Sequence, residues 1–163
     1  MSQSPLAPNR GAAPGVEDAT GRAPIHLADD LSFLLARANA LSLAAGNAAL
    51  APFGLKARSY SVLALAVDLD VRPSQRGLAE YLRLDPSQIV ALVDDLQRRG
   101  LIERRPDPAD RRANVVVATD AGRALHSRAL AAAERAEHEL HAALDDDERA
   151  QLARLLRRIA FAD

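Results

Sequence analysis

Cysteine and tryptophan are absent from this sequence of 163 residues, and aromatic side chains make up only 3% of it. The missing cysteines exclude disulfides, thiolate metal sites, cysteine nucleophiles and thiol redox sensing. The hydropathy pattern predicts no apolar run long enough to span a bilayer, so we expect no membrane partner. The first residues lack the apolar core of a secretory signal, and we therefore expect a cytoplasmic location.

Hydrophobic residues, mostly alanine and leucine, supply 48% of the chain. This composition favours helices that pack through aliphatic side chains. Residues 1–24 carry four prolines without apolar periodicity, which predicts a disordered tail. Apolar residues then recur at three- and four-residue spacing over 27–50 and 57–69, which predicts two helices.

Two shorter helices, separated by a tight turn, are predicted next. Ser74 is placed as the N-cap of the first, which extends to Leu82. Asp85 is placed as the N-cap of the second, with Pro86 at its first helical position and Gln88 completing a capping box. The pattern is typical of a helix–turn–helix.

The second of these helices has two chemically distinct faces. Its apolar residues follow the i, i+3, i+4, i+7 spacing of a buried stripe, namely Ile89, Leu92, Val93 and Leu96. The residues that lie largely away from this stripe are Ser87, Val90, Ala91, Asp94, Asp95 and Arg98. Gly100 is suited to end the helix in a left-handed conformation.

The segment after this helix has the pattern of a basic β-hairpin. Two short apolar strands, 101–102 and 115–117, flank a polar loop that two prolines punctuate. Between Arg98 and Arg112 the sequence holds six arginines and three acidic residues, although the net charge of the chain is −1. A local excess of positive charge suits a polyanion, and a basic hairpin beside a helix–turn–helix indicates a winged helix that binds DNA.

Two further helices complete the predicted fold. Thr119 is placed to cap a long helix from 120 to about 144, and the acidic run 145–147 to begin a last helix that ends near 160. The predicted fold class is therefore mainly α with a small β-hairpin wing.

The stretch RGLAEYLRLDPSQIVALVDDLQRRGLIERRPDPADRRANVVVATDAG, residues 76–122, resembles the multiple-antibiotic-resistance regulator (MarR) family of bacterial transcription factors. Its most specific parts are DPADRRA and ATDAG. The resemblance implies a winged helix–turn–helix over 57–118. It implies a homodimer formed through an N-terminal helix over 25–56 and C-terminal helices over 119–163. It also implies a repressor that a small molecule releases from a palindromic double-stranded DNA operator.

The resemblance also assigns roles to individual residues. Three residues at the start of the first short helix match phosphate contacts: Ser74, Gln75 and Arg76. Three residues of the second short helix match groove-facing positions: Ser87, Gln88 and Ala91. In the wing, Asp110 matches a brace for Arg112, which enters the minor groove. Apart from the resemblance, Arg104 and Arg105 lie near the base of the hairpin, where we expect them to hold phosphates or neighbouring acids. The candidate DNA-binding set is Ser74, Gln75, Arg76, Ser87, Gln88, Ala91, Arg98, Arg104, Arg105, Asp110, Arg111 and Arg112.

The second short helix departs from the family pattern. Many relatives have arginine or lysine where Ala91 and Asp95 stand. Ala91 offers only apolar contact, as to a thymine methyl, which leaves Gln88 as the candidate reader of adenine. Asp94 and Asp95 repel phosphate unless Arg98 or Arg99 neutralises them. These acids leave open a winged-helix protein-interaction module without DNA binding.

In the family, an effector pocket lies between the dimer helices and the DNA-binding lobe. Four residues are candidates for lining it: Phe33, Arg37, Tyr60 and His126. A small aromatic anion would suit Arg37. Glu134, His138 and His141 lie one helical turn apart and leave open a metal-responsive regulator, but they complete no ligand set, so we assign no metal site. No nucleophile–base pair or cofactor fingerprint is present, so we predict neither an enzyme nor a cofactor.

Overall fold

The structure, a computed structural model, describes residues 27–68, 72–107 and 113–162. The chain divides into two compact units, residues 1–40 and 41–163. The elements in chain order are η1 (Leu27–Asp29), α1 (Leu31–Leu50), η2 (Ala51–Phe53), α2 (Ala57–Val67), α3 (Gln75–Leu82), α4 (Pro86–Arg98), β1 (Ile102–Pro106), β2 (Asn114–Ala118), α5 (Asp120–Leu140) and α6 (Asp146–Ala160).

Helix α1 and the short η2 turn form an apolar segment, Leu31–Phe53, with a mean hydropathy of 1.2. By length and composition alone this segment could cross a membrane, so the expectation that no run is long enough was wrong. Alanines and leucines supply most of its residues, and Arg37 is its one charged side chain. A helix that pairs with other helices has the same composition, because its apolar face must also leave water.

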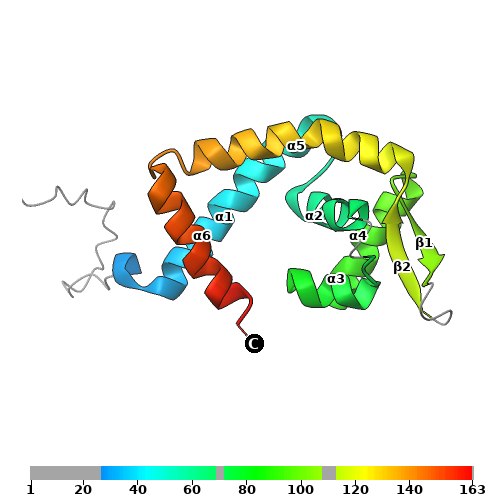
Figure 1. Cartoon of the computed structure of the whole chain (residues 1–163), viewed down its shortest axis with the longest axis horizontal. Coiled ribbons are helices and arrows are strands. Elements are labelled where there is room, and N and C mark those ends of the chain that lie inside the picture. The colour runs from blue at the N-terminus through cyan, green and yellow to red at the C-terminus, as the bar shows by residue number, and fades with distance from the viewer. Residues whose placement is uncertain (1–26, 69–71, 108–112, 163) are drawn as a thin grey trace, which may run out of the picture. The chain divides into compact units, whose positions relative to one another are not determined.

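The core of the second unit lies where α2, α3 and α4 pack together beside the β1–β2 hairpin (Figure 1). The predicted buried stripe of α4 is confirmed, because Ile89, Val93 and Leu96 are fully buried and Leu92 is partly buried. The other large core side chains with almost no exposure are Leu50, Leu63, Leu78, Ile102, Val62 and Val116. This core fixes which face of α4 remains exposed.

Side-chain caps begin the short helices as predicted, with one exception. The Ser74 hydroxyl accepts the Gly77 amide N–H at 3.0 Å and starts α3. The Asp85 carboxylate starts α4, but it accepts from Ser87, so the capping box predicted with Gln88 was wrong. Ser87 lies two residues after the cap, and its amide and hydroxyl both reach the Asp85 carboxylate.

The hairpin is antiparallel, with Ile102 opposite Ala118 and Pro106 opposite Asn114. Its strands are longer than predicted because polar residues of β1 also pair with β2. The segment before α3 joins the same sheet: Ser74 forms a bridge with Val115, and the Val116 amide donates to the Pro73 carbonyl at 2.8 Å. The start of α3 is thereby tied to the wing.

Helix α5 begins beside the hairpin and leads away from it, and α6 follows from its far end (Figure 1). The Thr119 hydroxyl caps α5 by accepting the Gly122 amide N–H at 3.1 Å, as predicted. Helix α5 ends at Leu140, earlier than the predicted 144, because Asp145 and Glu148 form a capping box that begins α6. Gly100, with φ of 69°, adopts the left-handed conformation predicted for it.

Candidate nucleic-acid interface

Helix α4 presents a continuous exposed face opposite its buried stripe. Three predicted groove-facing residues, Ser87, Gln88 and Ala91, are exposed on its first two turns. The remaining exposed side chains of this helix are Pro86, Val90, Asp94, Gln97 and Arg98. Because the diameter of a helix matches the width of the DNA major groove, this face has the dimensions of a DNA reader.

The start of α4 is held by a charged cap. The Asp85 carboxylate accepts the Ser87 backbone N–H at 2.8 Å and also the Ser87 hydroxyl. These two hydrogen bonds, the hydroxyl contribution being the larger, hold the pKa of Asp85 below its ordinary value. Ser87 therefore has its hydroxyl hydrogen directed at Asp85, and only its oxygen lone pairs remain for another partner.

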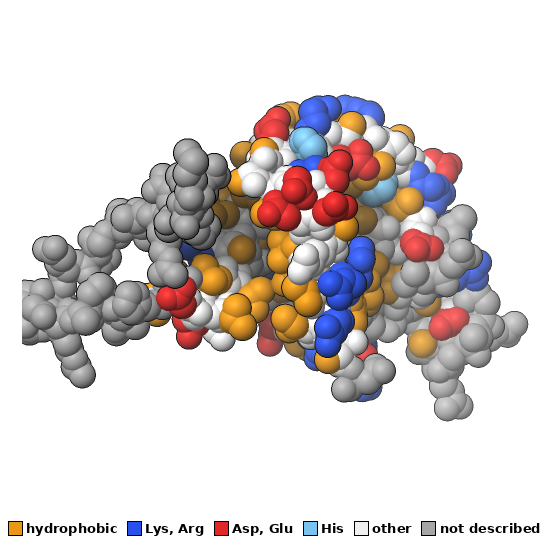
Figure 2. All heavy atoms as spheres, turned by 60° about the vertical axis from the view of Figure 1, so that its left-hand side comes forward, with side chains coloured by type: hydrophobic (Ala, Val, Ile, Leu, Met, Phe, Trp, Pro, Cys, Tyr) orange, Lys and Arg blue, Asp and Glu red, His pale blue; other side chains and the backbone are white. Residues whose placement is uncertain are grey.

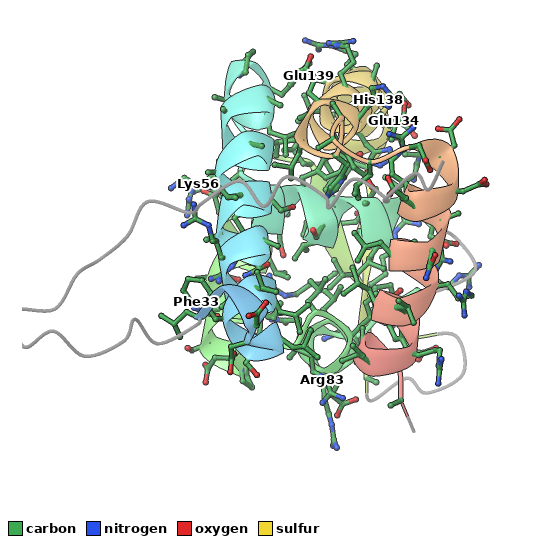
Figure 3. All side chains as sticks on the ribbon, turned by 90° about the vertical axis from the view of Figure 1, so that its left-hand side faces the viewer. Phe33, Lys56, Arg83, Glu134, His138 and Glu139 are labelled. Carbon is green, nitrogen blue, oxygen red and sulfur yellow. The ribbon has the colours of Figure 1, made fainter. Side chains whose placement is uncertain are left out.

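The turn between α3 and α4 is built on an arginine in a left-handed conformation. Arg83 has φ of 51° and ψ of 43°, and its amide donates to the Ala79 carbonyl. Glycine is the usual residue there, because a side chain costs about 1–2 kcal/mol in this conformation. The Arg83 side chain is exposed and extends away from the end of α3 (Figure 3). Sequence reasoning missed this residue.

Arg104 joins three elements of the interface. From strand β1 its Nε donates to Gln75 Oε1 of α3 at 3.0 Å. Its two terminal nitrogens donate to Gln97 and Asp94 of α4. The side chain is only 25% exposed. The sequence offered two roles for Arg104, holding a phosphate or holding a neighbouring acid, and the structure shows the contact with an acid. It also shows that the side-chain oxygen of Gln75 accepts from Arg104.

The acidic residues of α4 are paired within the chain. Asp94 pairs with Arg104. Asp95 pairs with Arg98 and, at 3.5 Å, with Arg99, as the sequence suggested. The partner of Asp94 lies on another element, ten residues away, so helical spacing gave no sign of it. These pairs reduce the negative potential of a face that sequence alone makes appear acidic.

Two more candidate arginines have acidic neighbours. Arg76 donates from Nε to Glu80 at 2.8 Å, one turn along α3, and this hydrogen bond raises the pKa of Arg76 further above its ordinary value. Arg105 pairs with Glu103 on the same strand. Both arginines are strongly exposed, and exposed pairs of this kind open at little cost. The predicted tip residues Asp110, Arg111 and Arg112 lie outside the described residues.

A groove of 380 Å³ lies between α3 and α4. Apolar atoms of Ala79, Pro86 and Val90 line it, together with Gln75, Arg76 and Glu80. Val90 is 44% exposed, although its neighbour Ile89 is fully buried. The groove therefore adds a concave apolar element to the exposed face of α4.

Tyr60 and His126, two of the predicted pocket residues, are stacked on each other. Their ring centroids lie 5.3 Å apart and their planes differ by 10°. Partial burial, with a smaller contribution from the charge of Glu134, raises the pKa of Tyr60. Phe33 and Arg37, the other two candidates, are exposed residues of α1 in the first unit.

A hollow of 630 Å³ lies against one face of α5. Glu134, His138 and Glu139, which line it, project from the same stretch of this helix (Figure 3). None of the four predicted pocket residues lines this hollow. Among the residues that the structure describes, no three histidine or acidic side chains are grouped to hold a metal ion.

Comparison with known proteins gives consistent matches. The MarR family matches residues 53–113. A MarR-family transcriptional regulator from Rhodococcus sp. RHA1 is 44% identical, with a TM-score of 0.78 over 84% of this chain and 96% of its own. CouR from Rhodococcus jostii RHA1, bound to p-coumaroyl-CoA, is also 44% identical, with a TM-score of 0.77 and the same coverage of both chains.

Matches to curated proteins are shorter. The transcriptional repressor NicR of Pseudomonas putida is 31% identical over 90 residues, which are 55% of this chain and 57% of NicR. The matching segment spans about half the length of the curated relatives.

Proposed function

This chain belongs to the MarR family, and from that premise we propose that it is a homodimeric repressor that binds a palindromic DNA operator and releases it on binding an aromatic small molecule. The observation that carries the proposal is the exposed face of α4, held by its cap at Asp85 and joined to the wing by Arg104. A helix positioned in this way can enter the major groove while the hairpin reaches an adjacent groove.

In this proposal, residues of three elements divide the contacts with DNA. Ser74, Gln75 and Arg76 lie at the start of α3, where backbone amide groups and an exposed arginine suit phosphates. Gln88 and the residues around it on α4 face the bases. Gln75 accepts from Arg104 through its side-chain oxygen, which orients its side-chain NH2 group as the donor to a phosphate. Asp110, Arg111 and Arg112 keep their wing roles on the strength of the sequence resemblance.

The homodimer is proposed from apolar side chains that remain exposed at the end of the chain. The exposed apolar residues of the last helix and its end are Leu152, Leu155, Leu156, Ile159 and Phe161. Figure 2 shows hydrophobic side chains gathered on the face that carries α6. In the first unit α1 also exposes leucines along its length. A second copy would cover these faces, because contiguous apolar patches are characteristic of interfaces.

Light scattering on the purified chain tests the dimer directly. We expect a mass twice that of one chain. Ile159→Asp should give a monomer, because Ile159 is 65% exposed and a charge there cannot be buried without a partner. Asn114→Asp, which adds the same charge at the one exposed position of strand β2, is the matched control and should remain dimeric. A dimer in both variants would contradict an interface through α6.

The effector is proposed to stack beside the Tyr60–His126 pair. An aromatic ring can extend a stack that two half-buried rings have begun, and a relative that is 44% identical was crystallised with p-coumaroyl-CoA. Phe33 and Arg37 remain candidate partners from α1. An aromatic acid or its CoA thioester is therefore the proposed ligand class.

Thermal unfolding with p-coumarate, p-coumaroyl-CoA and CoA alone tests this class. An aromatic ligand at about 100 times its Kd should add roughly 2.7 kcal/mol to the free energy of unfolding, while CoA alone adds nothing. His126→Ala should weaken the effect, and Tyr60→Phe, which keeps the ring, should preserve it. A melting temperature unchanged by both aromatic compounds would count against the proposal.

Selection of bound sequences from random DNA duplexes tests the operator. We expect a palindrome with half-site centres about one helical turn, roughly 34 Å, apart. Affinity should fall steeply as salt rises, because bound phosphates release counterions. Arg112→Ala should weaken binding and lower the salt dependence, whereas Arg128→Ala, an exposed arginine on α5, should not. Failure to enrich any sequence would favour a protein-interaction module.

A further inference from the structure

The exposed face of α4 carries apolar residues rather than charged ones on its second turn. Val90 and Ala91 are exposed on its second turn, and Pro86 is exposed one turn before Val90. The fully buried core residues of α4 are Ile89, Val93 and Leu96, and Val90 is not among them. An exposed β-branched side chain in a helix also loses rotamer freedom, so it brings no local advantage.

Val90 lies in a concave part of the surface. It lines the groove of 380 Å³ between α3 and α4, with Pro86 beside it and Ala79 at the opposite wall. The side chain of Arg76 lies at the edge of the groove and is 88% exposed. Glu80 also lines the groove and pairs with Arg76 at 2.8 Å, but an exposed pair of this kind opens at little cost. Arg76 can therefore turn to a partner that carries a small apolar group next to negative charge.

The major-groove edge of an A·T pair carries one apolar group, the C5-methyl of thymine, which a G·C pair lacks. Phosphates of both strands flank this edge. An alanine or valine side chain contacts this methyl by van der Waals packing and by removing it from water. The groove admits a methyl group, and Arg76 is placed to meet a phosphate nearby.

We propose that Val90 and Ala91 read thymine through its methyl group, so that each operator half-site carries thymine where it meets the second turn of α4. This inference rests on the proposed function and names the base recognised there. The apolar pair would take the place of the arginine or lysine that reads guanine through hydrogen bonds in other DNA-binding helices.

The expected effect follows from the loss of one methyl contact. Burying one methylene-sized group changes affinity about fourfold. Replacing the contacted thymine by deoxyuridine, which lacks only the methyl, should therefore weaken binding about fourfold in one half-site. Because a palindrome presents the same contact twice, replacement in both half-sites should weaken binding roughly sixteenfold.

The experiment uses the full chain and the duplex obtained by selection, with fluorescence anisotropy as the readout. Each thymine of the half-sites is replaced by deoxyuridine in turn, and thymines outside them serve as controls. Val90→Ala and Val90→Thr are measured on every duplex, the second because it keeps the shape and β-branching of valine. Circular dichroism verifies that both variants fold.

In the expected result, one or two half-site positions respond to deoxyuridine, and at the position that Val90 contacts the response is smaller in the Val90→Ala variant. This non-additivity is the signature of direct contact. Equal binding of the thymine and deoxyuridine duplexes, or half-sites without thymine, would overturn the proposal and leave the proposed function standing. Absence of binding to any duplex would overturn both.

Discussion

Replacing Arg104 with alanine tests whether one side chain holds the wing against α3 and α4. The substitution removes hydrogen bonds to Gln75, Gln97 and Asp94. A neutral hydrogen bond contributes about 1 kcal/mol and one to a charged group about 1.5–3 kcal/mol. Asp94 is half exposed, and water compensates for part of the loss. We therefore expect the free energy of unfolding to fall by about 2 kcal/mol, which for a chain of this length lowers Tm by about 4–8 °C.

The adjacent arginine on β1 is the matched control. Arg105 pairs with Glu103 and its side chain is 62% exposed. Exposed pairs contribute little, so Arg105→Ala should change stability by less than about 0.5 kcal/mol. Both variants are measured by thermal and urea unfolding. Equal melting temperatures for the two variants would refute the bridging role of Arg104.

The same substitution separates charge from geometry in DNA binding. Without Arg104, Asp94 would face DNA as an unpaired carboxylate, and a unit charge about 8 Å from a phosphate costs about 0.5 kcal/mol in water, roughly a twofold loss of affinity. Arg104→Lys restores the positive charge but not three directed hydrogen bonds. We expect the Arg104→Lys variant to recover the affinity for DNA that is lost through charge, while its Tm stays as low as that of Arg104→Ala. Any operator affinity that Arg104→Lys fails to recover would measure how much the position of the wing contributes to DNA binding.

The remaining predictions concern the backbone and one cap. Gly122→Ala would place a Cβ 1.9 Å from the Leu101 carbonyl oxygen, so we expect about 1–3 kcal/mol of destabilisation, whereas Gly77→Ala has its nearest contact at 3.5 Å and should stabilise α3 by roughly 0.5–1 kcal/mol. Arg83→Gly should raise stability by about 0.5 kcal/mol in urea unfolding, because relief of the left-handed strain exceeds the entropy cost of glycine; a lower midpoint would contradict this. Since the folded-state pKa of Asp85 is lowered, its carboxylate stabilises the fold above its unfolded pKa near 3.8 and loses this effect as pH falls further. The stability difference between the wild type and Asp85→Asn should therefore be constant above about pH 5 and close in stronger acid.

The elements of the DNA-binding lobe were predictable because local rules place them. Periodicity identified the buried stripe of α4, and short polar residues identified the caps at Ser74, Asp85 and Thr119. The hydrogen-bond partner of the Asp85 cap was less predictable than its position. Gln88 matched a capping-box spacing, yet the Ser87 hydroxyl satisfies the same carboxylate over a shorter distance in sequence.

Contacts between elements were not predictable, because no local spacing encodes them. Arg104 and Gln75 are 29 residues apart, and their hydrogen bond exists only after the hairpin folds onto α3. The apolar length of α1 was underestimated for a related reason: alanines raise its hydropathy without forming one continuous leucine stretch. The stacking of Tyr60 on His126 likewise depends on how α2 meets α5, although the sequence had made both residues candidates for lining the pocket.

The acids of α4 were the main reason to consider a winged helix that does not bind DNA, and their pairing removes this reason. Asp94 and Asp95 are each held by arginine of the same chain, so the helix presents paired charge rather than a negative face. Asp94 and Asp95 still occupy positions where a guanine-reading arginine could stand, and the exposed residues nearer the start of the helix are uncharged: Pro86, Ser87, Gln88, Val90 and Ala91. We therefore expect recognition by such a face to rely on Gln88, on methyl contact and on the wing rather than on arginine of α4. Asp94→Ala combined with Arg104→Ala should therefore bind the operator better than Arg104→Ala alone, because the double variant leaves no unpaired carboxylate toward DNA. If the double variant bound no better, repulsion by Asp94 would not be the reason for the pairing.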